Sequence, residues 1–343
     1  MTFATRGRVL SCLALPFVFC TIALASEPAV IDRTLVVSGR VSLDVRSDPG
    51  GVYISTGTSP DVVIHAIIKP LYGRLDLDIA EANIRALEKN PPIEQVGNQI
   101  RIGYVKDPAL LRAVTIRFEI VTPRATQVHA QTESGGISID GIAGPVETLT
   151  SSGRTEITHV AGTVKVTGHS GSVIVRDAGA DVSVRSGSGG LQLSGIRGNL
   201  DCETTSGRIE ISDVSGDTHA ATHSASIRID QAKGSVVALN TSGSVESLQI
   251  SGPVRAETTS GAIRISQLSP APIRALTRSG EIKVQLASGG GYLLDARSDS
   301  GKVTARNIGA FAKTKGAHSL KGPIGSGGPL VDLYTRSAKI VID

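Results

Sequence analysis

The stretch "TTSGRIEISDVSGD", residues 204–217, decides the fold because it reads as a short strand between two Ser-Gly turns. Close variants occur as "TESGGISIDGIAGP" at 132–145 and "TTSGAIRISQLSPA" at 258–271. After each Ser-Gly pair, apolar and polar residues alternate, which is the pattern of a strand with one buried face. A phrase that recurs in this way is either a copied site or the structural unit of the fold.

The Ser of this phrase recurs at a constant spacing, with looser copies near the C-terminus. The regular copies are Ser134, Ser152, Ser170, Ser188, Ser206, Ser224, Ser242 and Ser260, and the looser ones are Ser279, Ser300 and Ser337. When each regular copy is numbered from its Ser as position 1, position 2 is Gly except at Ala225, and position 11 is mostly Gly. Positions 4, 6, 13 and 15 are mostly apolar or small. Each unit therefore predicts two strands, joined by glycine turns that need positive φ.

One such unit cannot bury its own apolar residues, so neighbouring units must stack. Stacking at ~4.8 Å per coil gives every strand two hydrogen-bonded partners. We therefore predict an all-β fold, a single-stranded parallel β-helix or flattened β-solenoid of 18-residue coils, wound right-handed as parallel crossovers prefer. An up-and-down barrel also alternates, but it does not require like residues at a fixed offset. Outer-membrane barrels need strands of ~9–11 residues and aromatic girdles, whereas aromatic residues make up 3% of this chain.

The chain divides into three segments. Residues 1–25 predict a signal peptide, residues 26–127 a β-rich capping region, and residues 128–343 the solenoid repeats, with an insertion at about 305–328. Within the capping region, "DIAEANIRALEKN" at 78–90 has apolar residues near helical spacing and predicts one short helix. We expect this region to cover the first edge of the stack, which would otherwise template aggregation.

Residues 1–25 have the features of an export signal. Two arginines precede an apolar run over 9–24, and an A-x-A cleavage site ends at Ala25, before Ser26. An uncleaved membrane anchor is disfavoured because the run is short, and a lipid anchor at Cys20 is disfavoured by the bulky Phe19 before it. No later run is long enough to span a bilayer as a helix. We expect an exported protein, periplasmic or extracellular at the cell surface, without a transmembrane segment in the mature chain.

Charge and cysteine content narrow the functions further. The net charge is +4, and loss of the two arginines of the signal (4 − 2) leaves +2. This small excess does not favour a nucleic-acid partner. The mature chain would keep only Cys202, so it forms no internal disulfide. Cys202 falls at position 15 and is expected to be a buried, small apolar side chain.

None of the residues that could carry chemistry forms a convincing site. A catalytic Ser needs one base and one oxyanion hole, whereas the Ser of this repeat serves every coil, so we expect it to hydrogen-bond local backbone. His169 and His223 share a column but lie three coils apart, roughly 14 Å at the strand spacing, and His159 and His219 fall in other columns. We therefore predict no catalytic, cofactor-binding or metal-binding residue and no cofactor, and the binding residues stay unassigned.

Charged residues also follow the repeat. Acidic residues at positions 7 and 8 are interpreted as solvated turn carboxylates, because calcium-binding nonapeptides are absent; these are Asp140, Asp177, Asp213 and Asp230. Outward position 5 predicts a column of opposite charges that pair between coils, namely Glu210, Arg228, Glu246 and Arg264.

An exported chain with SG-x-I-x-I repeats and the ending "GSGGPLVDLYTRSAKIVID" (325–343) resembles the bacterial putative-adhesin domain family. The resemblance covers 128–343 and, more loosely, the strands before it. It implies a β-solenoid of the bacterial envelope, of largely unknown function, and it carries over no catalytic residue. Ala225 and Ala338 depart from the pattern where Gly is expected, and the spacing slips after Ser260.

The resulting hypothesis is a non-enzymatic exported envelope or surface protein, adhesin-like, that mediates macromolecular interaction with a protein or polysaccharide. One alternative is a polysaccharide-active β-helix enzyme, a lyase or hydrolase, because such enzymes share this architecture. Another is a periplasmic scaffold that self-associates. Function is expected where the stack departs from its period, chiefly at 26–127 and 305–328, or on the broad outer faces.

Overall fold

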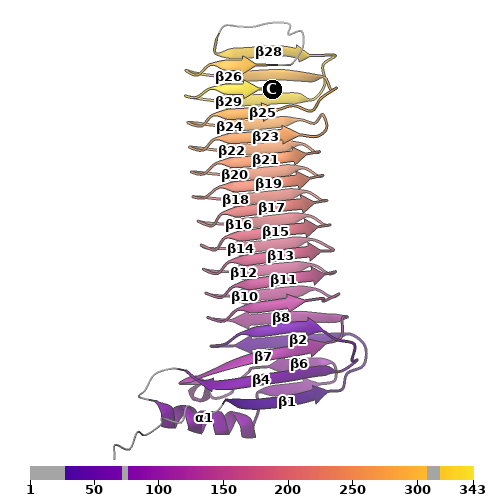
Figure 1. Cartoon of the computed structure of the whole chain (residues 1–343), viewed down its shortest axis with the longest axis vertical. Helices are drawn as coiled ribbons and strands as arrows, with labels where there is room; N and C mark the ends of the chain where they lie inside the picture. The colour runs from indigo at the N-terminus through magenta and orange to yellow at the C-terminus, as the bar shows by residue number, and fades with distance from the viewer. Residues whose placement is uncertain (1–27, 72–75, 307–316) are drawn as a thin grey trace, which may run out of the picture.

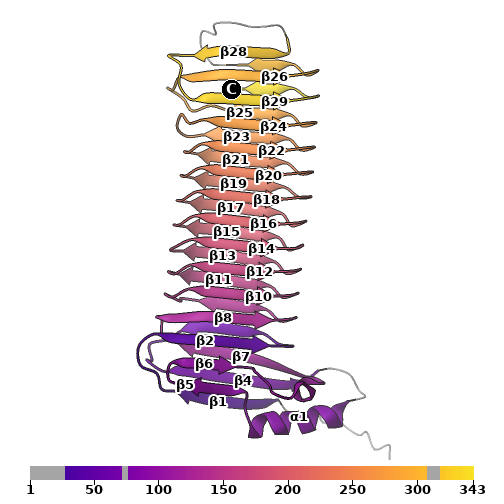
Figure 2. The ribbon, with the colours of Figure 1, turned by 180° about the vertical axis from the view of Figure 1, so that it is seen from behind.

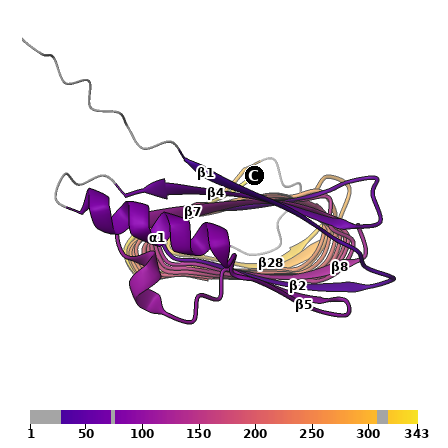
Figure 3. The ribbon, with the colours of Figure 1, turned by 90° about the horizontal axis from the view of Figure 1, so that it is seen from below.

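The computed structural model describes residues 28–71, 76–306 and 317–343. Its strands stack into a tall column (Figure 1), which Figure 2 shows from behind. They form two sheets of 15 strands each, and the view along the column shows the sheets facing one another in a flattened section (Figure 3). The predicted β-solenoid is therefore confirmed, with two main faces; its handedness stays a prediction. Within the described ranges, no helix has the length and apolarity needed to cross a membrane.

The regular coils alternate between the two sheets, which we call sheet A and sheet B. Successive strands of one sheet are parallel and pair exactly one repeat apart, as in Ile209 with Ile227. The strands of this part of sheet A are β9 (Ile137–Asp140), β11 (Thr155–Val160), β13 (Val173–Ala178), β15 (Leu191–Ile196), β17 (Ile209–Val214), β19 (Ile227–Ala232), β21 (Val245–Ile250), β23 (Ile263–Gln267) and β25 (Ile282–Gln285). Those of sheet B are β8 (Thr126–Thr132), β10 (Val146–Thr150), β12 (Val164–Gly168), β14 (Val182–Ser186), β16 (Leu200–Thr204), β18 (Thr218–Thr222), β20 (Val236–Asn240), β22 (Val254–Thr258) and β24 (Ile273–Thr277).

The core contains a column of buried apolar residues, at position 9, that the repeat pattern did not predict. Position 8 takes a left-handed conformation, as at Asp177 (φ 55°) and Asp213 (φ 53°). This residue changes the phase of the alternation, so that position 9 also points inward; Val160, Ala178, Ile196, Val214, Ala232 and Ile250 are buried there. Asp177 and Asp213 therefore stand at a kink inside β13 and β17 and not on the turns where they were expected. Their side chains are solvent-exposed, as predicted.

The corner glycines at position 2 are explained by close approach and not, as predicted, by positive φ. Gly189 and Gly207 do not have left-handed conformations. A Cβ added to Gly207 would lie 1.8 Å from the carbonyl oxygen of Gly189, and one on Gly189 would lie 1.8 Å from that of Gly171. Successive corners are thus stacked backbone on backbone, and only a residue without a side chain fits between them.

A column of buried polar residues at position 17 fastens these corners. Thr277 belongs to this column because it pairs with Thr258, although one extra residue after Ser260 moves it to position 18. Its Oγ1 donates to the carbonyl oxygen of Gly261 in the coil below (3.0 Å) and accepts from the N–H of Gly280 (3.2 Å). The Ser column was expected to make such bonds. Its eight regular members are exposed, and among the described residues only the hydroxyls of the looser copies Ser300 and Ser337 bond a carbonyl oxygen, each on a neighbouring coil.

Replacement of Thr277 by Val should cost about 1–3 kcal/mol of unfolding free energy, because a buried N–H and a carbonyl oxygen lose their shared partner. Thr218 is an internal control, since its Oγ1 is buried with no hydrogen-bond partner. Thr218→Val should be neutral or stabilising. Urea denaturation of the two variants measures this difference, and equal losses would contradict the fastening role.

The N-terminal region contributes one coil to the stack and a cap below it. β2 (Val41–Ser47) pairs with β8 and with β6 (Gln99–Ile102). β3 (Val52–Thr56) pairs with β9 and with β7 (Val114–Thr122). Below them, β7 pairs with β4 (Val62–Pro70), β4 with β1 (Ala29–Leu35), and β6 with β5 (Ile93–Val96), all antiparallel.

The one predicted helix is present as α1 (Leu77–Lys89). It lies across the lower end of the column, with Ala80, Ile84 and Leu87 buried (Figure 3). The domain boundaries at residues 25 and 127 stay predictions, and residues 1–27, which include the expected signal and the Ala25-Ser26 cleavage site, lie outside the described residues.

At the C-terminal end, chain order and spatial order differ. The final coil, β29 (Leu330–Thr335) and β30 (Ile340–Ile342), lies inside the stack (Figure 1). β29 pairs with β24 on one side and with β26 (Tyr292–Ser298) on the other. β30 similarly lies between β25 and β27 (Val303–Ala305). The expected insertion contributes β28 (Ser319–Ile324), which pairs antiparallel with β26, while residues 307–316 lie outside the described residues.

Candidate binding surfaces

The outer faces carry charges that pair between coils. On sheet A, Glu246 accepts bonds from Arg228 and Arg264 on the coils below and above it, both at 2.7 Å. This confirms the predicted column at three of its four members, whereas Glu210 pairs with Arg208 (3.6 Å) of its own coil. Because the arginines are half-exposed, each pair adds only ~0.2–1 kcal/mol. The column stiffens the face without requiring a ligand.

The histidines do not converge on a common site. His169 and His223 are exposed. His159 Nδ1 lies 2.8 Å from Asp140 Oδ1, and its Nε2 lies 3.6 Å from Asp177 Oδ2. The hydrogen bond to Asp140, followed by the charge of that carboxylate, raises the pKa of His159 above its ordinary value of 6.5. In turn, hydrogen bonds from Thr158 and then His159 lower the pKa of Asp140.

The raised pKa of His159 fixes the sign of its pH dependence. Because Asp140 must be ionised and His159 protonated, the ion pair stabilises the fold fully between the ordinary pKa values of Asp (3.8) and His (6.5). This contribution is lost as the pH rises through the higher pKa of His159 in the folded state, or falls through the lowered pKa of Asp140. Asp140→Asn should therefore return the pKa of His159 toward its ordinary value. An NMR titration of the His159 ring measures this, with the ring of His169 as an exposed reference, and an unchanged midpoint would refute the assignment.

Three potential metal ligands meet on sheet B. Asp201 and Glu203 of β16 and His219 of β18 place ligand atoms within 4.8 Å of one another. This group was not predicted from the sequence, although Asp201 and His219 lie one repeat apart and are therefore adjacent in register. Arg185 of the coil below reaches both carboxylates, at 3.3 Å from Asp201 and 3.4 Å from Glu203. We interpret the group as an exposed ion-pair network in which Arg185 already supplies the positive charge.

Cys202 is fully buried between Val184 and Ala220, as predicted. Burial, followed by the charges of Asp201 and Glu203, raises the pKa of its thiol far above the usual range. The thiol is therefore protonated and inaccessible, which removes it as a nucleophile or metal ligand.

Two shallow grooves lie on the outer face of sheet B. One, of about 540 Å³, is lined by Arg185, Glu203, Ala221, His223 and Leu239, together with the corner threonines. The other, of about 610 Å³, crosses the opposite ends of the same strands and reaches His219 and Val237. Ala221 and Leu239 of the first groove and Val237 of the second are neighbours on β18 and β20, and they form a partly exposed apolar strip shared by the two grooves. This face combines an apolar centre with a charged rim.

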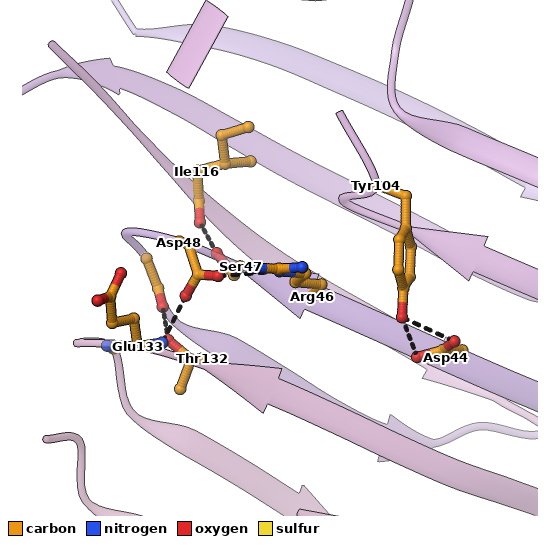
Figure 4. A network of polar contacts seen from close by, with 10 residues as sticks. Asp44, Arg46, Ser47, Asp48, Tyr104, Ile116, Thr132 and Glu133 are labelled. Atoms are coloured by element: carbon orange, nitrogen blue, oxygen red, sulfur yellow. Dashed lines mark hydrogen bonds and ion pairs between the residues drawn. The ribbon is translucent and has the colours of Figure 1, made fainter. Parts of the chain in front are cut away.

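A separate pocket of about 370 Å³ lies in the N-terminal cap. It is walled by the end of β2, by the segment after β6 and by the 3₁₀ helix η1 (Pro108–Leu111). In Figure 4 the Tyr104 hydroxyl points at the carboxylate of Asp44, while Arg46 and Asp48 face each other at the end of β2. Tyr104 donates to Asp44 at 2.8 Å. Burial, and then the bond to Asp44, raises the pKa of Tyr104.

The sequence profile of the Toastrack family, DUF4097, matches residues 98–343. The chain belongs to the Toastrack family. This assignment confirms the family resemblance predicted from the Ser-Gly repeats. The Toastrack match begins at β6, so β2 of the stack lies outside it. The N-terminal pocket is consequently built by Toastrack residues such as Tyr104 together with residues that precede the match, such as Arg46.

Two solved structures align with this Toastrack chain over most of their length. One, described as a candidate cell adhesion protein of Clostridium sporogenes, covers 92% of this chain and 99% of its own, at 11% identity and a TM-score of 0.25. The other, described as a candidate adhesin of Bacteroides fragilis, covers 92% and 97%, at 14% identity and a TM-score of 0.23. Similarity at this level carries no argument about function. The comparison with curated proteins gave no match.

Proposed function

We propose that this Toastrack protein is an exported, non-enzymatic binding protein of the cell envelope that presents the outer face of sheet B to a macromolecule. The observation that carries the proposal is the apolar strip of Ala221, Val237 and Leu239, which is shared by the two grooves. Protein interfaces have this anatomy, an apolar centre surrounded by a polar rim. The expected signal over residues 1–25 motivates export.

The stacked strands make this face suited to a long partner. Neighbouring outward side chains stand ~4.8 Å apart on adjacent strands, and the charged side chains around the strip are held by ion pairs, such as Arg185 with Asp201. A prearranged rim loses little side-chain entropy when a partner binds. The geometry therefore supports recognition of an extended surface more than chemistry on one bond.

Co-sedimentation of the purified mature protein with isolated cell envelopes tests the proposal. The unmodified protein should sediment with the envelopes, and the double variant Ala221→Glu, Leu239→Glu should bind about tenfold more weakly, because it places charges in the apolar centre. The matched variant Ser194→Glu, Ser212→Glu, on the groove of sheet A, should bind like the unmodified protein.

Equal binding by both double variants would exclude sheet B as the docking face, and no sedimentation of the unmodified protein would refute envelope binding. Turnover of an envelope polymer, abolished by one substitution, would overturn the non-enzymatic assignment in favour of a polysaccharide-active enzyme. Sedimentation of the protein in the absence of envelopes would instead indicate a self-associating scaffold.

A further inference from the structure

The N-terminal pocket has the features of a small-molecule site. It lies at the lower end of sheet B, against β2, β6 and β5, several strands away from the apolar strip on β18 and β20. Its volume of about 370 Å³ falls in the range of ligand pockets, ~300–1,000 Å³. One wall is apolar and consists of Val105, Pro108 and Leu111. The lining also includes the cations Arg46, Arg101 and Lys106. A ligand here would meet an apolar surface and a positive one.

The nearby carboxylates are largely engaged by the protein itself. Asp48 is only 15% exposed; its Oδ2 accepts from Arg46 Nε at 3.0 Å, and its Oδ1 accepts from the N–H of Glu133 (Figure 4). Both oxygens of Asp44 face the Tyr104 hydroxyl. These carboxylates hold the side chains that line the pocket, and their oxygens are already bonded within the protein.

The cations are not matched by free anions. Arg46 and Arg101 have side chains 48% and 51% exposed, and Glu94 lies 3.7 Å from Arg101. Lys106 is exposed, and among the described residues it forms no ion pair or hydrogen bond. The lining itself therefore holds three cations against Asp48 and Glu94, an excess of one positive charge (3 − 2). Asp44 is not part of the lining, and its carboxylate is bonded to the Tyr104 hydroxyl. This charge matches a monoanion.

The pocket is also held in shape. Gly103 has φ 81°, and a Cβ on it would lie 1.7 Å from the carbonyl oxygen of Arg46, so the segment after β6 is pressed against the end of β2. The Arg101 guanidinium stacks 4.0 Å from the centre of the Tyr104 ring. Because these side chains are already ordered, little entropy is lost when a ligand enters.

We propose that this pocket binds a compact ligand carrying one carboxylate, with the carboxylate between Arg46 and Lys106 and the body of the ligand against Val105 and Leu111. Arg46 bonds Asp48 through Nε, so its terminal nitrogens are the donors that face a carboxylate. The chemistry is shared by an acidic sugar and by the carboxyl end of a peptide.

Chemical-shift titration of the protein with four probes tests this. D-glucuronate represents an acidic sugar and N-acetyl-L-alanine a peptide end, while D-glucose and inorganic phosphate are controls. We expect saturable binding of at least one of the two monocarboxylates. Both controls should bind at least about tenfold more weakly than that carboxylate. The carboxylate that binds more tightly identifies the source. Absence of binding by both carboxylates, or equal binding of phosphate, would overturn the proposal.

Lys106→Met should weaken binding of the preferred carboxylate about tenfold, since it removes the unpaired cation and keeps the length of the side chain. Lys233→Met is the matched control, because Lys233 is an exposed lysine on a distant coil. This variant should bind the preferred carboxylate with the affinity of the unmodified protein. If the two variants bind alike, the pocket is not the site. The titration uses no envelope material, so its result is separate from the co-sedimentation on which the proposed function depends.

Discussion

Replacement of Gly189 by Ala should destabilise the protein by about 3 kcal/mol, a large effect for a single methyl group. The added Cβ would lie 1.8 Å from the carbonyl oxygen of Gly171 and 3.0 Å from Ser186 Oγ. Neither coil can move away without breaking its pairing with the next. Chemical denaturation of the variant measures the loss, and a fall in the denaturation midpoint without a change in slope is expected.

The adjacent residue provides the control. Gly190 belongs to the same coil, has no positive φ, and would bring its Cβ no closer than 3.8 Å to another atom, the carbonyl oxygen of Arg208. Gly190→Ala should therefore be neutral or stabilising by up to about 1 kcal/mol, because Ala has less freedom in the unfolded chain. Comparable destabilisation in both variants would mean that the close approach at position 2 is not what selects glycine.

Leu333→Asp should disorder the upper end of the stack and not only its own strand. Leu333 is fully buried in β29, and an unpaired charge there costs several kcal/mol. Because β29 is the partner of both β24 and β26, its loss should also expose the amides of β26 and β28. Hydrogen exchange should show lost protection over the described residues 292–306 and 317–343 and retained protection from β10 to β20.

Leu330→Asp is the matched substitution, because Leu330 begins the same strand but is 48% exposed. It should leave exchange across the stack close to that of the unmodified protein. If Leu333→Asp removes protection only from β29 and β30, the strands above do not depend on the final coil.

The architecture could be predicted from the sequence because residues one constant repeat apart pair with each other in neighbouring strands, so the spacing gives the strand register. The same spacing could also have predicted two features that the sequence analysis missed, the group around Asp201 and the apolar column at position 9. Asp201 and His219 are one period apart, so their meeting could have been found, and Val160 and Val214 belong to an apolar column at position 9. That column was overlooked because simple alternation predicts position 9 to point outward, and one left-handed residue changes the phase.

The N-terminal pocket could not be predicted in the same way. In the sequence, Arg46 and Lys106 are separated by a hairpin, a helix and several strands. These elements do not repeat, so no regular spacing predicts that the two residues meet. The placement of the final coil was hidden for a related reason. The sequence spacings from Ser279 to Ser300 and from Ser300 to Ser337 are irregular. An irregular spacing does not predict which strands pair with one another.

Two coils are interleaved between strands that are distant in the sequence, β2–β3 in the lower part of the stack and β29–β30 in the upper part. Synthesis proceeds from the N-terminus, so the strands up to β28 exist before the residues that must separate β24 from β26. A polypeptide that ends early leaves two facing strand edges without their shared neighbour, and such edges invite aggregation and proteolysis. The strands β24 and β26 therefore gain their shared neighbour only after residues 330–335 have been synthesised.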